Sequence, residues 1–229
     1  MRAGESIAWI IATRNDHKVG EIRAILGAKF RYFTLRDFPS APAVTEDAPD
    51  FAGNATKKAV EIANFLAQEP PIWGKHEAWV MADDSGLEVD ALGGAPGVHS
   101  ARFAASDSKS GNSPDAANNE KLLTLLRNIP LPERSARFRC VIAITPVTEA
   151  QPETNVCHAN ESELRTQLFD GRCEGHIALA PSGQGGFGYD PLFIPNGHSQ
   201  SFAELGEDVK NGMSHRAKAL AELREWLTR

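Results

Sequence analysis

The sequence has few cysteines, and none of them form a close pair. Cys140, Cys157 and Cys173 are the only three among 229 residues. An odd number of widely spaced cysteines fits free thiols in a reducing compartment better than a disulfide framework. The seven histidines also lack the H-x-x-x-H spacing that is typical of a zinc site. We therefore expect neither a disulfide scaffold nor a zinc centre.

The sequence also lacks a long hydrophobic run and an excess of positive charge. No stretch is long enough to span a bilayer or to form the core of a signal peptide, so we expect a cytoplasmic protein with no membrane partner. The formal net charge of -6 argues against a nucleic-acid partner, because general nucleic-acid binders usually have a basic surface. A composition of 41% hydrophobic and 24% charged residues is ordinary for a globular protein.

The order of apolar runs and amphipathic stretches predicts an α/β fold. A buried strand at residues 7–12, a helix from about 17 to 26 and a second strand at 30–35 give the strand–helix–strand order of a layered fold. Further helices are expected over 51–67, 122–126 and 214–227, further strands over 79–82, 137–144 and 171–179, a surface loop over 106–119 and a long hairpin connection over 148–166. Since no linker or repeat is evident, we expect one domain, with two lobes, over residues 1–229.

Two adjacent carboxylates are the most informative local feature. Asp83 and Asp84 follow the apolar run 79–82, at the end of the expected strand, and precede Ser85. Adjacent like charges need a reason, and a divalent cation is the commonest one, because hard cations bind oxygen ligands. The alternative is a helix N-cap or a solvated turn, which Asp and Ser both favour. The motif alone leaves both interpretations open.

Two other segments have the residue types of a phosphate and metal site. Residues 13–18 join the first strand to the first helix, where free N–H groups and the helix dipole favour an anion, although the P-loop pattern is absent. Glu46 precedes the helix that carries Lys58, so it could form a Mg²⁺ site together with the Asp83–Asp84 pair. In the first case the alternative is an ordinary N-cap at Thr13 or Asn15 with Lys18 exposed. In the second it is a helix start with acids favourably placed on the helix dipole.

Two further segments have the residue types of a nucleobase pocket. The stretch 185–191 combines several glycines with Phe187 and Tyr189, whose rings could stack on a base. Lys210 and the 214–216 segment flank the start of the last helix, where Lys gives a point charge for phosphate and Arg gives directed donors for a carbonyl oxygen. The alternatives are a hairpin whose aromatic rings pack into the core and a helix capped by Ser214 with solvated basic residues.

Taken together and in this order, these segments resemble the inosine triphosphate pyrophosphatase family. The resemblance runs from Ile7 to about Leu223, through Thr13-Arg14-Asn15 with Lys18, Phe51 with Asn54-Ala55 and Lys58-Ala59, Ala82 to Leu87, Gly93 to Gly97 with Ser100-Ala101-Arg102, Gly186 to Pro191, and Ser214-His215-Arg216. It implies a two-lobed α/β fold with an elongated mixed sheet flanked by helices, an active site in the cleft between the lobes, and a homodimer. It also implies Mg²⁺-dependent cleavage of the purine nucleoside triphosphates ITP, dITP and XTP to the monophosphate and pyrophosphate, which removes deaminated purines from the nucleotide pool.

The resemblance also implies a role for each matching residue. Asp84 is the expected catalytic carboxylate, which orients or deprotonates the attacking water, and Asp84 and Glu46 are the expected Mg²⁺ ligands. The expected contacts to the triphosphate come from Thr13, Arg14, Asn15, Lys18, Lys58 and Lys210, with Ser85 beside them. The expected base pocket consists of Phe187, Gly188, Tyr189, Asp190, His215 and Arg216. Arg216 could donate to the 6-oxo group of hypoxanthine or xanthine, and a site of that kind can reject adenine by roughly 10⁴-fold or more.

The chain departs from the family pattern near Glu46 and in the first loop. Arg14 stands where glycine is common, Gly53 stands where an acid often precedes the Asn, and residues 47–50 replace a Thr- and Gly-containing stretch. Two other functions stay open. One is a related Maf-type pyrophosphatase that prefers pyrimidine or modified nucleotides, which the purine-pocket segments disfavour. The other is a nucleotide-binding regulator that does not hydrolyse its ligand, and the presence of Asp84, Lys18 and Lys210 argues against it.

Overall fold

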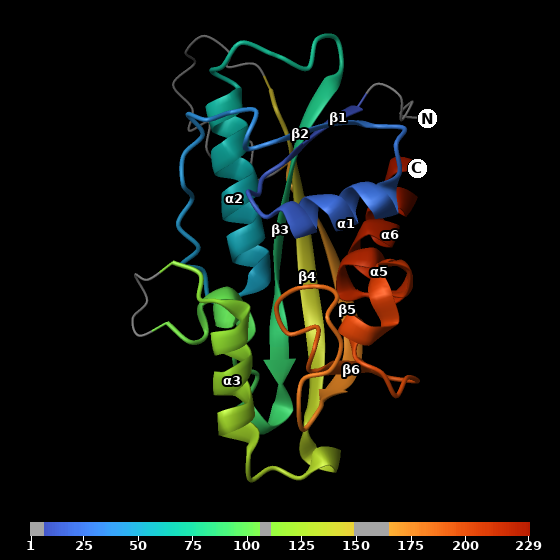
Figure 1. Ribbon diagram of the computed structural model, residues 1–229. Helices are drawn as coiled ribbons and strands as arrows, with labels where there is room; N and C mark the ends of the chain where they lie inside the picture. Colours follow the sequence, from blue (N-terminus) through green and yellow to red (C-terminus); the bar gives the residue numbers. More distant parts are fainter. Residues whose placement is uncertain (1–6, 106–110, 149–164) are drawn as a thin grey trace. The chain divides into compact units, whose positions relative to one another are not determined.

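The computed structural model describes residues 7–105, 111–148 and 165–229 (Figure 1). Within these ranges, six strands form one sheet in the order β2-β1-β3-β4-β5-β6, flanked by helices. The strands are β1 (Ile7–Ile11), β2 (Arg31–Thr34), β3 (Glu77–Val89), β4 (Ser135–Pro146), β5 (Gln167–Ile177) and β6 (Phe193–Pro195). The helices are α1 (Asp16–Leu26), α2 (Phe51–Leu66), α3 (Asp115–Leu126), α5 (Phe202–Met213) and α6 (His215–Leu227), with 3₁₀ turns at Asp90–Leu92, Gly97–Arg102 and Leu131–Glu133.

The sheet is mixed, which confirms the predicted α/β class. β1 pairs in parallel with both β2 and β3, whereas β5 pairs antiparallel with β6. Among the residues that the structure describes, no helix is both long enough and apolar enough to cross a membrane. Most of the expected connection over 148–166 lies outside the described residues, as do positions 106–110 of the expected loop.

The chain forms two compact units. Unit 1 consists of residues 1–84, 141–170 and 219–229, and unit 2 consists of residues 85–140 and 171–218. The division falls within β3, β4 and β5, so these three strands each contribute residues to both units. The predictions of a single domain and of a cleft between two lobes stay predictions, and each unit is described by itself below.

Unit 1 is built around β1, whose five residues are all buried. Such a continuous apolar run is typical of a strand with parallel neighbours on both sides, and Trp9 of β1 lies opposite Tyr32 of β2 and Trp79 of β3. After β1 the chain enters α1, where Asn15 is the N-cap and its Oδ1 accepts a hydrogen bond from the Lys18 backbone N–H. The predicted order of strand, polar loop, helix and strand is therefore confirmed.

Unit 2 has its own hydrophobic core. The core joins β3, β4 and β5 to α3, α5 and the segment before β6, and its buried members include Leu87, Leu122, Leu126, Phe138, Ile177, Tyr189, Phe193 and Phe202. The Phe138 ring packs against the Phe193 ring, with 4.7 Å between the two ring centroids. The buried Arg134 guanidinium donates to the carbonyl oxygens of Leu126, Ile129 and Ala178. The Leu126 and Ile129 carbonyls lie at and just beyond the C-terminal end of α3, and the Ala178 carbonyl follows β5, so Arg134 joins these two elements.

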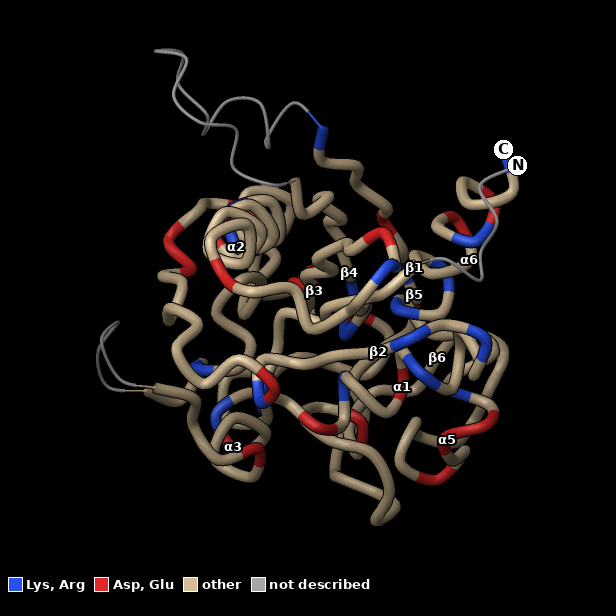
Figure 2. The backbone as a smooth tube through the Cα atoms, turned by 90° about the horizontal axis from the view of Figure 1, so that it is seen from above, with Lys and Arg blue, Asp and Glu red and all other residues tan. Residues whose placement is uncertain are grey.

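Four elements differ from the sequence-based expectation. β3 continues to Val89, so Asp83 and Asp84 lie inside a strand and the expectation of a strand end at Ala82 is wrong. α3 begins at Asp115, so the second part of the expected loop over 106–119 is helical. The sequence interpretation also missed α5 and β6. Figure 2 shows Lys and Arg positions in several parts of the chain beside Asp and Glu positions, so an acidic chain still offers local positive charge.

Candidate active site

The start of α1 brings a lysine to the adjacent carboxylates of β3. Thr13 Oγ1 accepts a hydrogen bond from the Asn15 N–H at 3.1 Å, and Asn15 caps the helix. One turn later, Lys18 Nζ lies 2.5 Å from Asp83 Oδ1, and only 1% of the Asp83 side chain is exposed. The alternative interpretation of Lys18 as an exposed side chain is therefore wrong. Its ammonium group neutralises a carboxylate that burial alone would disfavour.

The middle of α2 brings a second lysine to a second carboxylate. Lys58 Nζ lies 2.5 Å from Glu46 Oε1, and both side chains are largely buried. Next to this pair is a cavity of about 200 Å³, lined by Ala12, Thr13, Arg14, Leu35, Pro42, Ala43, Val44, Glu46, Lys58 and Ile62. Four residues that the sequence assigned to triphosphate or metal binding, from three separate segments, therefore line one cavity in unit 1: Thr13, Arg14, Glu46 and Lys58.

Asp84 lies in the same charged surroundings. Asp84 is 6% exposed, and burial is the main reason that the pKa of its carboxyl group rises from 3.8 to about 6. The charges of Lys18 and Lys58 lower this pKa, and the charge of Glu46 raises it. Its Oδ2 atom is buried and makes no hydrogen bond with any residue that the structure describes. A buried carboxylate oxygen without a partner is costly, and it indicates a place where a ligand or ion completes the site.

These residues fit a Mg²⁺ ion that binds together with a triphosphate. Mg²⁺ prefers oxygen ligands, and it is usually held by one or two carboxylates plus substrate phosphates. Asp84 offers the unpartnered Oδ2 atom, and Glu46 offers a second carboxylate nearby. Within residues 7–105, 111–148 and 165–229, no three His, Cys, Asp or Glu side chains gather closely enough to hold a metal by themselves. The donor set therefore fits an ion that shares its coordination with a nucleotide.

In unit 2, a buried ion pair fixes the glycine-rich loop before β6. Asp190 Oδ2 accepts from Lys210 Nζ at 2.6 Å and from the Phe187 backbone N–H at 2.9 Å. The same ammonium group lies 4.4 Å from the centroid of the Phe187 ring. A Cβ atom on Gly186 would lie 2.1 Å from Asp190 Oδ2, so only glycine fits at this position. Lys210 thus lies with the expected base-pocket residues, and its expected contact to the triphosphate stays a prediction.

Tyr189 belongs to the core of unit 2. It is 3% exposed, and its hydroxyl group donates to the Ser100 carbonyl oxygen at 2.9 Å. Burial raises the pKa of this hydroxyl well above its usual value of 10. The interpretation in which the aromatic rings of this segment pack into the core therefore describes Tyr189, whereas the Phe187 ring is half-buried. A role of either ring in binding a base stays a prediction.

The start of α6 carries two more of the expected pocket residues. Ser214 caps the helix, and its Oγ accepts from the Ala217 N–H at 3.2 Å. His215 stacks on Phe138 with 4.8 Å between ring centroids. Arg216 is completely buried, and its Nη2 donates to Ser85 Oγ at 3.0 Å. The alternative of solvated basic residues beyond a capped helix is therefore wrong, and Ser85 lies beside the expected base-pocket arginine.

The sequence interpretation gave no role to three polar residues near these groups. Asn54 is completely buried beside Asp84, lowers its pKa, and accepts from the Ala48 N–H through Oδ1 at 2.9 Å. Asp115 and Asn119 of α3 hydrogen-bond to Gly188 of the glycine-rich loop. Asn54 belongs to the motif of Phe51 with Asn54-Ala55, so the resemblance could have assigned it a role. Asp115 and Asn119 were hidden because their segment was interpreted as a loop.

The comparisons with known proteins agree with this arrangement of residues. The Ham1 family model matches residues 9–226. The chain is 43% identical to the dITP/XTP pyrophosphatase of Desulforamulus reducens over 221 residues, which cover 96% of this chain and 95% of the relative. It is 42% identical to the dITP/XTP pyrophosphatase of Halalkalibacterium halodurans, with 96% and 98% covered.

Solved structures lead to the same family. The HAM1 protein from Coxiella burnetii superposes with a TM-score of 0.74 and 33% identity, with 97% of this chain and 98% of that chain covered. The Staphylococcus aureus Ham1 protein gives a TM-score of 0.72 and 32% identity, with 96% and 98% covered. The resemblance inferred from the ordered motifs is thereby confirmed. Matched over nearly its whole length in sequence and in fold, the chain belongs to the Ham1 family.

Proposed function

We propose that this protein hydrolyses ITP, dITP and XTP to the nucleoside monophosphate and pyrophosphate in a Mg²⁺-dependent reaction. The observation that carries the proposal is the buried Asp84 carboxylate, whose charge interacts with Lys18, Lys58 and Glu46. Two curated relatives at 43% and 42% identity, both named dITP/XTP pyrophosphatase, support the choice of substrate. As part of the same proposal, the protein acts as a cytoplasmic homodimer that removes deaminated purine nucleotides.

The triphosphate would be bound by the two lysines and by the start of α1. A triphosphate requires several positive charges to offset its own charge and the charge of the transition state. Lys18 and Lys58 are already held in place by Asp83 and Glu46 at 2.5 Å, so little side-chain freedom remains to be lost on binding. Thr13 and Arg14 line the cavity beside Lys58 and would contact the phosphates from the other side.

Asp84 would act on the attacking water. A pKa of about 6 keeps its carboxylate mostly ionised at neutral pH and also makes it a stronger base than an exposed aspartate. Its buried Oδ2 atom has an unused acceptor position that could orient a water molecule or take its proton. Mg²⁺, when bound by Asp84 and Glu46, would supply Lewis acidity that offsets charge on the phosphate oxygens. Cleavage between the α- and β-phosphates releases pyrophosphate.

Base selection would depend on Arg216 and the loop over 187–190. Ser85 Oγ accepts from the Arg216 guanidinium, so the orientation of this buried donor group is fixed before a substrate arrives. A 6-oxo purine offers an acceptor to such a donor, whereas the 6-amino group of adenine opposes donor with donor and leaves both unpaired. The Phe187 ring, held near Lys210, would stack on the base.

The first experiment is a measurement of pyrophosphate release from ITP, dITP, XTP, ATP, GTP, dTTP and UTP, with and without Mg²⁺. The proposal expects Mg²⁺-dependent release from the first three and a lower kcat/KM for the others. Preference for dTTP or UTP would point to the Maf-type alternative, and no turnover at all would favour a binding role. Size-exclusion chromatography with light scattering tests the homodimer.

The catalytic role of Asp84 is tested by one variant with a matched control. We expect Asp84→Asn to lower kcat by about 10² to 10⁴-fold, because it removes the general base. Asp37→Asn is the control, since Asp37 is an exposed aspartate of the same unit, in the turn after β2, and lies outside the proposed site. Full activity of Asp84→Asn would overturn the proposed mechanism.

A further inference from the structure

The backbone N–H and C=O groups of one loop residue, Gly188, are both hydrogen-bonded to the same helix. The Gly188 N–H donates to Asp115 Oδ2 at 2.6 Å, and the Gly188 carbonyl oxygen accepts from Asn119 Nδ2 at 3.0 Å. Asp115 and Asn119 are four positions apart in α3, a spacing that places their side chains on one face of a helix. α3 therefore holds Gly188 on both sides, because Asp115 accepts from its N–H and Asn119 donates to its carbonyl oxygen.

Gly188, which α3 holds through these two hydrogen bonds, lies in the middle of the expected base loop over 187–190. Phe187 precedes Gly188 and Tyr189 follows it, so the position of Gly188 sets where both rings leave the backbone. Gly188 has a φ of +62°, a left-handed conformation that the chain would leave easily without external hydrogen bonds. The end of the loop is anchored by the Asp190–Lys210 ion pair and by the buried Tyr189. The two bonds from α3 fix Gly188, the residue before this anchored part.

α3 is itself fixed well enough to act as a support. Asn118 is buried, its Oδ1 accepts from the Ala104 N–H at 2.8 Å, and its Nδ2 donates to the Ala101 carbonyl oxygen. Leu122 and Leu126 of the same helix are completely buried in the core of unit 2. A rigid element that presents two directed groups to a loop is what a precise binding site requires.

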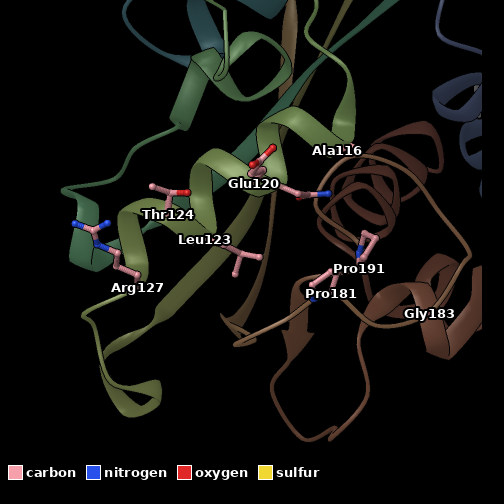
Figure 3. A pocket seen from close by; sticks show the side chains of 9 residues that line it. Ala116, Glu120, Leu123, Thr124, Arg127, Pro181, Gly183 and Pro191 are labelled. Carbon is pink, nitrogen blue, oxygen red and sulfur yellow. The ribbon is translucent and has the colours of Figure 1, made fainter.

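A cavity of about 610 Å³ lies along this part of α3 (Figure 3). Its lining comes from α3 and from the segments before and after the loop: Ala116, Asn119, Glu120, Leu123, Thr124, Arg127, Pro181, Gly183 and Pro191. The lining includes Asn119 but none of residues 187–190, so Gly188 is held on this side by its two hydrogen bonds from α3.

We propose that Asp115 and Asn119 are positioning residues that set the conformation of the base loop over 187–190 and so sharpen the preference for 6-oxo purines over adenine. This inference rests on the proposed function. A plainer role for Asp115 is an acidic residue in the first turn of α3, where it would stabilise the helix dipole. That role would affect stability and not the choice of substrate, so kinetics separates the two.

The test compares Asp115→Ala and Asn119→Ala with the conservative variant Asp115→Asn, which keeps an acceptor oxygen at the same place. Glu120→Gln and Thr124→Ala are matched controls, because both side chains line the cavity on α3 (Figure 3) without a hydrogen bond to the loop among the described residues. For each variant, kcat and KM are measured with dITP and dATP, and binding of IMP is measured by calorimetry. Hydrogen–deuterium exchange is followed over residues 186–190.

We expect each alanine variant to raise the KM for dITP by about 5- to 30-fold, the effect of one lost hydrogen bond to a binding loop. Because this bond acts on binding, kcat should change by less than about threefold. The ratio of kcat/KM for dITP to that for dATP should fall at least about fivefold. Exchange over 186–190 should become faster, IMP should bind more weakly, and Asp115→Asn and both controls should stay close to wild type.

Other outcomes would overturn the inference. An unchanged dITP-to-dATP ratio, with activity lost in proportion to the melting temperature, would show a merely structural role. Unchanged exchange over 186–190, or an Asp115→Asn variant as impaired as Asp115→Ala, would also overturn it. If the wild-type protein releases no pyrophosphate from dITP, the proposed function fails, and the exchange and IMP-binding measurements still decide whether Asp115 and Asn119 position the loop.

Discussion

Lys210 Nζ lies 2.6 Å from Asp190 Oδ2, and only 4% and 2% of the two side chains are exposed. Two charges taken out of water in this way are tolerated because they neutralise each other and because Asp190 also accepts from the Phe187 N–H. The pair connects the last turn of α5 to the base loop, two segments that are separated by β6 in the sequence. Stability and substrate binding should therefore both depend on it.

Removal of one partner of this pair should be far more damaging than removal of an exposed pair. Lys210→Met leaves the Asp190 carboxylate buried without a counter-charge, and we expect the free energy of unfolding to fall by about 3–5 kcal/mol. Lys57→Met removes a lysine from the more exposed pair with Asp47, and we expect a much smaller change in the free energy of unfolding. Urea denaturation of both variants measures the difference. A Lys210→Met variant as stable as Lys57→Met would contradict the importance of the buried pair.

Two glycines of the loop should respond differently to alanine. Gly186 has a φ of +74°, and a Cβ atom on it would lie 2.1 Å from Asp190 Oδ2. Gly188 has a φ of +62°, and among the described residues no atom beyond its chain neighbours lies within 4 Å of a Cβ atom placed on it. Gly188→Ala should therefore cost only the conformational term of about 1–2 kcal/mol. Gly186→Ala should cost more, because the Asp190 carboxylate must move away from Lys210. Thermal and urea denaturation would compare the two, and equal losses would show that the close approach to Asp190 does not matter.

Asp84 should make the metal-free protein less stable as the pH rises. Its pKa is about 6 in the folded protein and 3.8 in an exposed chain, so between these values the folded state holds the proton more tightly. The free energy of unfolding therefore falls as the pH rises from about 4 to about 6, and the full penalty is present above that window. At pH 7.5 in EDTA, Asp84→Asn should be more stable than wild type by about 1–3 kcal/mol.

The pH dependence provides the check on this stability prediction. The advantage of Asp84→Asn should disappear below about pH 4, where the wild-type carboxyl group is protonated in both states. Urea denaturation between pH 4 and pH 8 measures the difference in the free energy of unfolding between Asp84→Asn and wild type. Asp16→Asn, at an exposed aspartate that pairs with Arg36, is the control for this stability measurement. A difference that is the same at every pH would mean that the charge of Asp84 is not the cause.

Lys58 and Lys57 are neighbours in α2 with different surroundings. Lys58 lines the cavity beside Glu46, and Lys57 pairs with Asp47 at a more exposed position. Lys58→Met should lower kcat/KM for dITP by about 10- to 100-fold, because a charge-assisted contact to the triphosphate is lost. Lys57→Met should stay within about twofold of wild type. Steady-state kinetics at constant ionic strength tests both, and equal effects would indicate a general charge effect.

The sequence predicted the parts of the fold that depend on local pattern. The apolar run at 7–12 and the cap at Asn15 predicted the first strand and helix, because burial and capping leave signals within a few residues. The end of β3 could not be predicted in this way. Asp, Ser and Gly are depleted in strands, and only the neighbouring strands of the sheet keep residues 83–86 extended.

α5 was missed and the start of α3 was placed too late, although the sequence contains signals for both. α5 contains Gly206, with a non-helical φ of +81°, and this glycine breaks the periodicity. Its start has a capping box, in which Ser201 and Glu204 bind each other's backbone, and that pattern is recognisable. α3 starts after Pro114 with Asp115 in its first turn, a combination typical of helix starts, although the segment before it is rich in Ser and Asn.

The candidate site was predicted in composition but not in its pairings. Resemblance supplied Glu46, Lys58 and Asp84, and the structure places their charges close enough to interact. No local pattern could indicate that Lys18 neutralises Asp83 or that Lys210 is buried on Asp190, since these partners are far apart in the chain. Such pairings depend on tertiary packing, which propensity and spacing do not encode.

The register of β3 limits how the length of this protein can vary. Residues 77–81 pair in parallel with β1, and side chains beyond them alternate between the two faces of the sheet. One residue inserted or deleted between Met81 and Asp84 would turn the Asp84 carboxylate to the opposite face, away from Lys58 and Glu46. Two residues would restore the face but move the carboxylate along the strand. Length changes that preserve Asp84 among its partners are thus confined to the connections, and the spacing from the pairing of β1 to Asp84 is held constant.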